Sequence, residues 1–381
     1  MKLVRKDLPK ENNKKQEFGG LMLNIFSHSI KVILDNQASS GAYPASPNYP
    51  TYRYCWFRDS SFIAYAMDLV GQHDSASHFH DWAAACVNNR AEVITRAITK
   101  ARNTKRLRPQ DYLHARYNLD GSDVSNREWG NFQLDGYGTW LWALGEHMRQ
   151  TGGPLLEDWA KAAGLVANYL KNLWQYSCYD CWEEFPNKVH PYTLAAIFGG
   201  LQAHSMMSGG DYDAALGSIR QYVFENFVKN QHFIKFSGSA DVDASLLGLS
   251  TPYNLVVPDH PQMQATAAQI EENLCMGGGV HRYSADTFYG GGEWLLLSAW
   301  MGWYYTKVGE YKRAHEMLSW VEERTDNSGN MPEQVSTHLL SPSHMSVWED
   351  RWGKAATPLL WSHAMYLILY QQCKIIPTSS V

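Results

Sequence analysis

Helical periodicity recurs along almost the whole chain, whereas the alternation typical of strands is scarce. Twelve runs predict helices: 17–37, 59–71, 75–103, 134–150, 155–175, 192–208, 211–229, 241–249, 260–274, 291–307, 309–325 and 356–374. The even-numbered runs, such as Phe62–Val70, are apolar nearly all round, as buried helices are. The odd-numbered runs, such as Leu155–Asn172, carry one charged face. This alternation predicts an all-α fold in which helical hairpins form a ring, with the even-numbered helices inside.

Composition is consistent with one large domain. No long Ser/Gly/Pro linker interrupts the pattern, so we expect a basic tail at 1–16, a single barrel at 17–376 and a short tail at 377–381. The chain is 45% hydrophobic and 19% charged, too apolar for disorder. Its net charge of −5 gives no reason to expect a nucleic-acid partner.

The N-terminal sequence lacks the apolar core of a signal peptide, and no apolar run has membrane length. Six cysteines without an export signal are typical of reduced thiols. We therefore expect a cytoplasmic protein without a membrane partner. The pair Cys178 and Cys181 lacks the context of a zinc or redox site, and no metal or cofactor is expected.

Loops rich in glycine, aromatic and charged residues precede five of the predicted inner helices. Their sequences are RYCWFRD, WGNFQLDG, CWEEF, HRYSADTFYGGGEW, and MPEQ followed by WEDRWGKAATP. In a ring of hairpins, the N-terminal ends of all inner helices point to the same end. The five loops should therefore converge on one mouth, where loops on a rigid scaffold commonly carry function.

Two glutamates in these loops suggest acid–base chemistry. Hydrolysis of a glycosidic bond needs one protonated carboxyl group and one ionised carboxylate. We expect Trp182 and Phe185 to remove water from Glu183, and the charge of Glu184 to repel its ionised form. Both effects would raise the pKa of Glu183, as a general acid requires. Glu333 is expected in a more polar setting, where it would stay charged as a general base.

Two further features point to a sugar. The chain holds 15 Trp and 22 Tyr, several of them in the same loops, where aromatic faces suit the C–H surfaces of a sugar ring. The adjacent Arg58 and Asp59 have two interpretations. They either form an ion pair at a helix start or a clamp for neighbouring sugar hydroxyls.

The five loop sequences, in this order over roughly residues 20–375, resemble the signature loops of the glucoamylase family, glycoside hydrolase family 15. The resemblance implies an (α/α)6 barrel of twelve helices. It also implies inverting, exo-acting hydrolysis that releases glucose from the non-reducing end of α-glucosides.

The resemblance implies a role for each matched residue. Glu183 matches the general acid and Glu333 the general base. Arg58 and Asp59 match the pair that holds the 4- and 6-hydroxyls of the terminal glucose, and Glu184 matches a position in the leaving-group site. The other positions expected to bind substrate are Tyr52, Trp56, Trp129, Trp182, Arg282 and Trp294.

Residues 335–350 depart from the family pattern, so the leaving-group site should differ as well. The chain has room for the barrel alone, which favours short α-linked gluco-oligosaccharides, with α-1,6 (isomaltose-type) slightly ahead of α-1,4. Glucose would be the product.

The alternatives are a trehalase, a phosphorylase, an epimerase or a non-catalytic sugar-binding protein. An epimerase would use histidines, for which the candidates are His190, His281, His338, His344 and His363. The glycine runs Gly277–Gly279 and Gly290–Gly292 lack the phosphate-loop pattern and are interpreted as turns.

Overall fold

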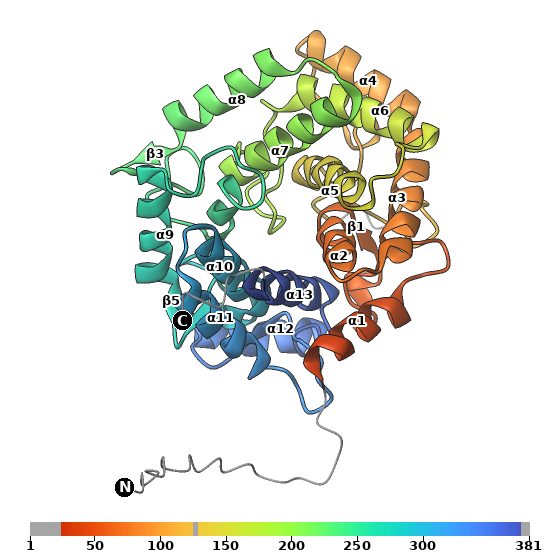
Figure 1. Cartoon of the computed structure of the whole chain (residues 1–381). Coiled ribbons are helices and arrows are strands. Elements are labelled where there is room, and N and C mark those ends of the chain that lie inside the picture. Colours follow the sequence, from red (N-terminus) through yellow and green to blue (C-terminus); the bar gives the residue numbers. More distant parts are fainter. Residues whose placement is uncertain (1–23, 125–128, 375–381) are drawn as a thin grey trace, which may run out of the picture.

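Six helical segments form an inner ring in the computed structural model, which describes residues 24–124 and 129–374. They are α2 (Phe57–Leu69), α5 (Asp135–Thr151), α7 (Pro191–Ser208), the 3-10 helix η3 (Ala244–Leu249), α10 (Leu295–Lys307) and α13 (Leu360–Lys374). Figure 1 shows the inner α-helices around the centre of the molecule. The inner positions are those predicted from the apolar runs, and the (α/α)6 barrel is confirmed. The predicted tails lie outside the described residues.

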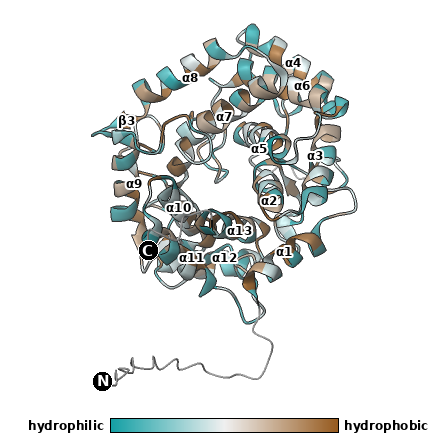
Figure 2. Cartoon of the chain, in the orientation of Figure 1, coloured by the Kyte–Doolittle hydropathy of each residue, from teal (hydrophilic) through white to brown (hydrophobic). Residues whose placement is uncertain are grey.

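An outer ring surrounds them (Figure 1). It consists of α1 (Ile25–Asn36), α3 (His73–Asn88), α4 (Ala91–Arg102), α6 (Glu157–Leu173), α8 (Asp213–Asn226), α9 (Pro261–Leu274) and α11 (Tyr311–Glu322). Figure 2 shows hydrophilic and hydrophobic residues mixed along outer helices such as α8 and α9. By contrast, α10 is buried along almost its whole length. The outer helices therefore cover the core with one face only.

Two predicted helices differ from the observed ones. The run 75–103 is split between α3 and α4 at Asn89 and Arg90, where the Arg90 side chain turns back to donate to the carbonyl of Cys86 (2.8 Å). Asparagine favours helix ends because its side chain competes for backbone hydrogen bonds. The run 241–249 forms only the 3-10 helix η3, and Pro252, which follows shortly after, cannot continue a helix.

Helices α5 and α7 approach each other closely. A Cβ atom added at Gly138 would lie 2.4 Å from the carbonyl oxygen of Ala196, and one added at Gly200 would lie 2.5 Å from that of Gly138. Only glycine permits this backbone contact. No helix in the described ranges is both long and apolar enough to span a membrane.

Short antiparallel strands tie the loops together at the N-terminal ends of the inner helices. Strand β1 (Cys55–Trp56) pairs with β2 (Arg116–Tyr117), and β3 (Val228–Lys229) with β4 (His232–Phe233). A four-stranded sheet has the order β5 (Cys275–Met276), β6 (Gly279–Val280), β7 (Glu293–Trp294) and β8 (Gln334–Val335). The pairing of β7 with β8 fixes the loop that carries Glu333 beside the start of α10.

Candidate active site

A cavity of about 380 Å³ opens where the loops before α2, α5, α7, α10 and α13 meet. This is the size of a small-molecule site. All eleven residues singled out from the sequence line it: Tyr52, Trp56, Arg58, Asp59, Trp129, Trp182, Glu183, Glu184, Arg282, Trp294 and Glu333. The predicted convergence of the five loops is therefore observed.

The cavity has a charged, buried floor and a partly exposed aromatic mouth. The side chains of Arg58, Asp59 and Glu333 are buried among the inner helices. Trp129 and Trp348, which also line the cavity, remain partly exposed. A ligand that fills this cavity would thus meet polar groups at its inner end and aromatic rings at its outer end.

Glu183 is held by two donors from other loops. Its Oε1 accepts hydrogen bonds from the indole Nε1 of Trp56 (2.6 Å) and from Nε2 of Gln133 (3.1 Å). The surroundings differ from those expected. Phe185 packs against Phe236 (ring centroids 5.0 Å apart) and does not line the cavity, so it does not remove water from Glu183.

The backbone at Glu183 is left-handed, with φ of +67°. Such a conformation is costly for a residue with a side chain and persists only where neighbours impose it. Here the carboxylate of Asp180 accepts hydrogen bonds from the backbone N–H groups of Trp182 (3.0 Å) and Glu184 (2.8 Å). Asp180 thus builds the turn that presents Glu183 to the cavity.

A buried ion-pair network supports this turn from behind. Lys235 Nζ lies 3.6 Å from the carboxylate of Asp180 and 2.6 Å from that of Asp243. Asp243 in turn accepts a hydrogen bond from Nε1 of Trp182 (3.0 Å). None of these three charged residues was predicted, because Asp180, Lys235 and Asp243 all lie outside the five loop sequences.

Glu333 lies in a more buried environment than expected. The residue is only 3% exposed. Its Oε1 accepts a hydrogen bond from the hydroxyl of Tyr52 (3.1 Å), and its Oε2 has no hydrogen-bond partner within the described residues. Burial raises the pKa of Glu333 to about 8, against the opposing effect of the Tyr52 hydrogen bond. The expectation of a polar setting and a permanently charged Glu333 is therefore wrong.

The two carboxylates are connected through aromatic side chains. Tyr52, which contacts Glu333, and Trp56, which contacts Glu183, meet edge to face with ring centroids 5.8 Å apart. The guanidinium of Arg116 lies over the rings of Trp56 (4.9 Å) and Trp129 (3.9 Å). These cation–π contacts fix the wall beside Glu183.

Arg58 and Asp59 lie side by side at the start of α2. Arg58 Nη1 donates to Oε1 of Gln133 (2.9 Å) and lies 3.3 Å from Asp135, while its Nε is 3.4 Å from Asp59 Oδ1. Burial raises the pKa of Asp59 to about 6, although Arg58 opposes this. The pair is both an ion pair at a helix start and a polar element of the cavity floor, so the two interpretations are compatible.

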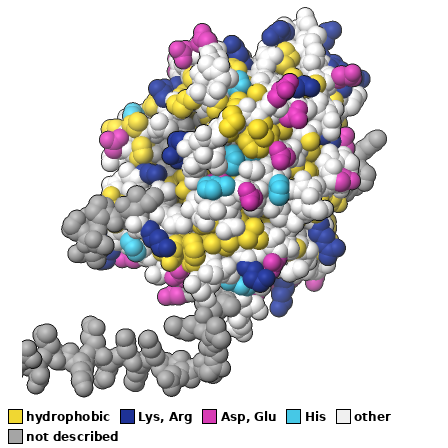
Figure 3. Space-filling model, turned by 45° about the vertical axis from the view of Figure 1, so that its right-hand side comes forward, with side chains coloured by type: hydrophobic (Ala, Val, Ile, Leu, Met, Phe, Trp, Pro, Cys, Tyr) yellow, Lys and Arg dark blue, Asp and Glu magenta, His cyan; other side chains and the backbone are white. Residues whose placement is uncertain are grey.

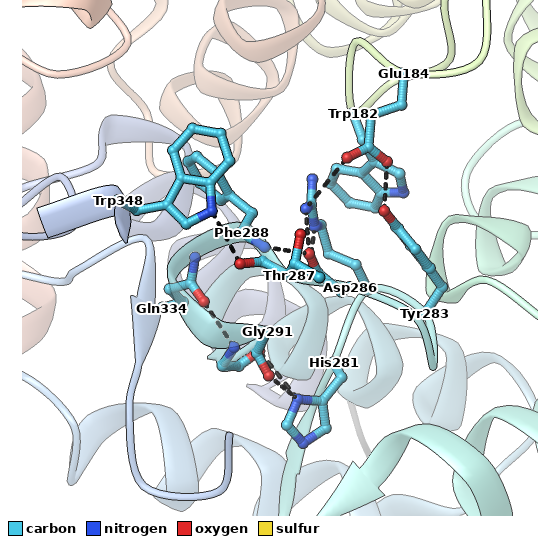
Figure 4. A network of polar contacts seen from close by, with 12 residues as sticks. Trp182, Glu184, His281, Tyr283, Asp286, Thr287, Phe288, Gly291, Gln334 and Trp348 are labelled. Carbon is cyan, nitrogen blue, oxygen red and sulfur yellow. Dashed lines mark hydrogen bonds and ion pairs between the residues drawn. The ribbon is translucent and has the colours of Figure 1, made fainter. Parts of the chain in front are cut away.

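Arg282 connects the loop before α10 with the loop before α7. Its Nε donates to Oδ2 of Asp286 (2.7 Å), and its Nη2 lies 3.6 Å from Glu184 Oε1. Glu184 also accepts a hydrogen bond from the hydroxyl of Tyr283 (2.6 Å), which Figure 4 shows pointing at the carboxylate. The charge of Glu184 is thus compensated by Arg282 and directed away from Glu183.

The segment that departs from the family pattern forms the outer rim. It contains the 3-10 helix η5 (Pro342–His344) and most of the short helix α12 (Met345–Trp352), of which Trp348, Arg351 and Trp352 line the cavity. Trp348 Nε1 donates to the carbonyl of Thr287 (2.9 Å), a contact drawn in Figure 4. All three belong to WEDRWGKAATP, one of the sequences expected at the mouth, although none of them was singled out there as a substrate-binding position.

The five histidines considered for an epimerase lie elsewhere. Within the described part of the chain none of them lines the cavity. His363, for example, is buried between the backbone N–H of Met331 (3.0 Å) and the hydroxyl of Ser29 (2.9 Å). The glycines at 277, 278, 290 and 291 have positive φ, as turns require.

Comparison with known proteins agrees with this geometry. The sequence profile of glycosyl hydrolases family 15 matches residues 21–371. The chain is 39% identical over 361 residues to the isomaltose glucohydrolase of Kribbella flavida, covering 93% of both chains. It is 26% identical to trehalase 1 of Sulfolobus acidocaldarius, covering 86% of this chain and 57% of that one.

A solved structure of a glycosidase variant in complex with glucose superposes with a TM-score of 0.89 at 38% identity, covering 93% of this chain and 97% of the other. The match extends over almost all of the described barrel and over the loops that form the cavity. The chain therefore belongs to glycosyl hydrolases family 15 and is a glycoside hydrolase of the inverting kind characteristic of that family.

Proposed function

We propose that this α-glucosidase is exo-acting and releases glucose from the non-reducing end of short α-linked gluco-oligosaccharides, with α-1,6 linkages favoured over α-1,4. The observation that carries the proposal is that Glu183 and Glu333 line one cavity, each fixed by a hydrogen bond from an aromatic side chain of the loop before α2. Two positioned carboxyl groups are the minimum equipment for this reaction.

In the proposed mechanism, Glu183 is the general acid and Glu333 the general base. Glu183 gives its proton to the glycosidic oxygen as the bond from that oxygen to C1 breaks. Glu333 takes a proton from a water molecule whose oxygen forms the new bond to C1 from the opposite face. The released glucose then has the β configuration, and the two carboxyl groups return to their starting states after proton exchange with solvent.

Exo action is supported by the charge distribution along the cavity. Arg58 and Asp59 are buried at the inner end, where a terminal glucose could place its 4- and 6-hydroxyls between a guanidinium and a carboxylate. A longer chain would have to project outward, past Trp129 and Trp348. This arrangement favours a terminal glucose over an internal unit of a polymer.

The preference for α-1,6 linkages is supported by the relative named isomaltose glucohydrolase, which is similar over 93% of its length. Trehalose is a second candidate substrate, because proteins named trehalases are also similar, at 26% and 24% identity. Initial rates on isomaltose, maltose and trehalose test the order. A rate on trehalose or maltose above that on isomaltose would refute the preference.

The raised pKa of Glu333 favours a second assignment of roles, in which Glu333 is the acid and Glu183 the base. α-Glucosyl fluoride separates the two, since fluoride leaves with little help from an acid. Under our assignment Glu183→Gln keeps much more activity on the fluoride than on isomaltose, whereas Glu333→Gln loses both. The reverse result would exchange the roles.

The anomeric configuration of the product, followed by proton NMR before mutarotation, tests the stereochemistry. Appearance of β-glucose first supports the direct displacement by water. Appearance of α-glucose first would refute it. The exposed Glu316→Gln provides a control for nonspecific effects of removing a carboxylate, because Glu316 lies on the outer helix α11.

A further inference from the structure

A second cluster of chemically reactive side chains lies at the other end of the barrel. Asp68 is near the C-terminal end of α2, His147 near that of α5, and His80 in the middle of α3. Each offers one donor atom, and the three atoms lie within 4.8 Å of one another. Asp59 of the cavity floor is nine residues before Asp68 on α2, which corresponds to roughly 14 Å along the helix axis.

His80 is unusual because it is buried and lacks a hydrogen-bond partner in the described part of the chain. The residue is 0% exposed, and neither ring nitrogen has a hydrogen-bond partner among the residues described. Its ring is packed against the rings of His147 (centroids 5.0 Å apart) and Trp159 (5.7 Å). Burying a polar group without a partner costs free energy, and such groups are rare in folded proteins. A ligand for its nitrogen would remove this cost.

The other two members are already positioned by hydrogen bonds. His147 Nδ1 lies 2.9 Å from both carboxylate oxygens of Asp68, and its Nε2 lies 3.2 Å from the hydroxyl of Ser77. His73 Nδ1 lies 2.8 Å from Asp68 Oδ1. Three imidazoles thus surround one buried carboxylate.

This donor set selects a class of ligand. Imidazole nitrogen and carboxylate oxygen are the donors used by Zn²⁺ sites, at about 2.0–2.2 Å from the ion in a tetrahedral arrangement.

We propose that Asp68, His80 and His147 bind one Zn²⁺ ion, with the fourth position open to solvent. The site would link the inner helices α2 and α5 to the outer helix α3, and its role would be structural because it has no contact with the catalytic cavity. The His73 side chain is 43% exposed, which gives the ion a route from solvent. On the face drawn in Figure 3, several histidine side chains lie at the surface near acidic ones.

Cobalt provides the direct test. The full-length protein, without a histidine tag, is treated with a chelator, dialysed and titrated with Co²⁺, whose visible absorption reports four-coordinate nitrogen and oxygen ligands. We expect one equivalent of Co²⁺ to produce this spectrum and one equivalent of Zn²⁺ to remove it. Absence of the spectrum in the wild-type protein would overturn the proposal, whatever the variants do.

Variants assign the signal to the cluster. His80→Gln should weaken Co²⁺ binding by more than about tenfold, as expected for the loss of a metal ligand. His204→Gln is the matched control, since His204 is a buried histidine of α7 outside the cluster with a hydrogen bond to Ser208 (3.3 Å). Unchanged Co²⁺ affinity in His80→Gln, or an equal loss in both variants, would contradict the assignment.

The thermal midpoint gives a second measurement. Because the ion would bind only the folded state, Zn²⁺ should raise the midpoint of the chelated wild-type protein and leave that of His80→Gln unchanged. An equal rise in both proteins would place the ion elsewhere and overturn the proposed site.

Discussion

Replacing Glu333 by glutamine removes an ionisable group and keeps an oxygen that can accept the hydrogen bond from Tyr52. In the folded protein burial raises the pKa of Glu333 from its ordinary value of 4.5 to about 8. The native state therefore binds the proton more tightly than the unfolded chain does. The resulting contribution to stability is fully present below pH 4.5 and is lost as the pH rises through about 8.

The size of the effect follows from the shift. Each pKa unit corresponds to about 1.4 kcal/mol, so the full cost of ionising Glu333 in the fold is about 5 kcal/mol. About 4 kcal/mol of this develops between roughly pH 5 and pH 9. The neutral glutamine has no such cost. E333Q should therefore be close to the wild-type protein in stability at low pH and more stable by about 5 kcal/mol at high pH.

Urea unfolding of both proteins, followed by tryptophan fluorescence at several pH values, measures this difference. Glu316→Gln is the control, because the Glu316 side chain is 62% exposed and its replacement should give a pH-independent difference near zero. If the difference between E333Q and the wild-type protein stayed constant from low to high pH, Glu333 would not be desolvated, and the proposed reason for its raised pKa would be refuted.

Three further predictions concern activity. If Glu333 is the base, kcat/KM rises with pH through about 8. The hydrogen bond from Tyr52 lowers the pKa of Glu333, so its loss in Tyr52→Phe should raise that pKa and move the rise in kcat/KM to higher pH. A pH profile that stays in place would contradict the contact. Asp180→Ala removes two hydrogen bonds to the turn at Glu183, so kcat on isomaltose should fall by about tenfold or more. Asp180→Asn keeps an oxygen that can accept these bonds and should retain part of the activity. An equal loss of kcat in both variants would argue against a positioning role. Trp348→Ala removes an aromatic side chain from the rim of the cavity, so KM for a disaccharide should rise by about tenfold at nearly constant kcat. Initial-rate measurements test this, and an unchanged KM would exclude α12 from substrate binding.

The ring of helices was accessible from the sequence because its signal is local and repeated. An apolar run such as that in α10 differs from the amphipathic run of α11 over a few turns, and the order of the two kinds determines which helix lies inside. Loops that precede inner helices must then meet at one end. The loops that carry the site could be gathered in this way without knowledge of any distance, whereas most individual substrate-binding positions, such as Tyr52 and Trp129, were implied only by the family resemblance.

The electrostatic environment was not accessible in the same way. The prediction for Glu333 relied on its sequence neighbours, whereas the hydroxyl group that contacts its carboxylate comes from Tyr52, in the loop before α2. Likewise, His80 and His147 are separated by 67 positions in the sequence, and only the packing of α3 against α5 brings them together (147 − 80 = 67). Burial and pairing are properties of the assembled structure.

The attachment of α12 has an evolutionary consequence. The helix lies outside both rings and contributes side chains to the rim, where Trp348 is fastened to the neighbouring loop through the carbonyl of Thr287. Insertions, deletions or exchanges in 336–352 should therefore alter which sugars enter and leave the two helical rings and the two glutamates undisturbed.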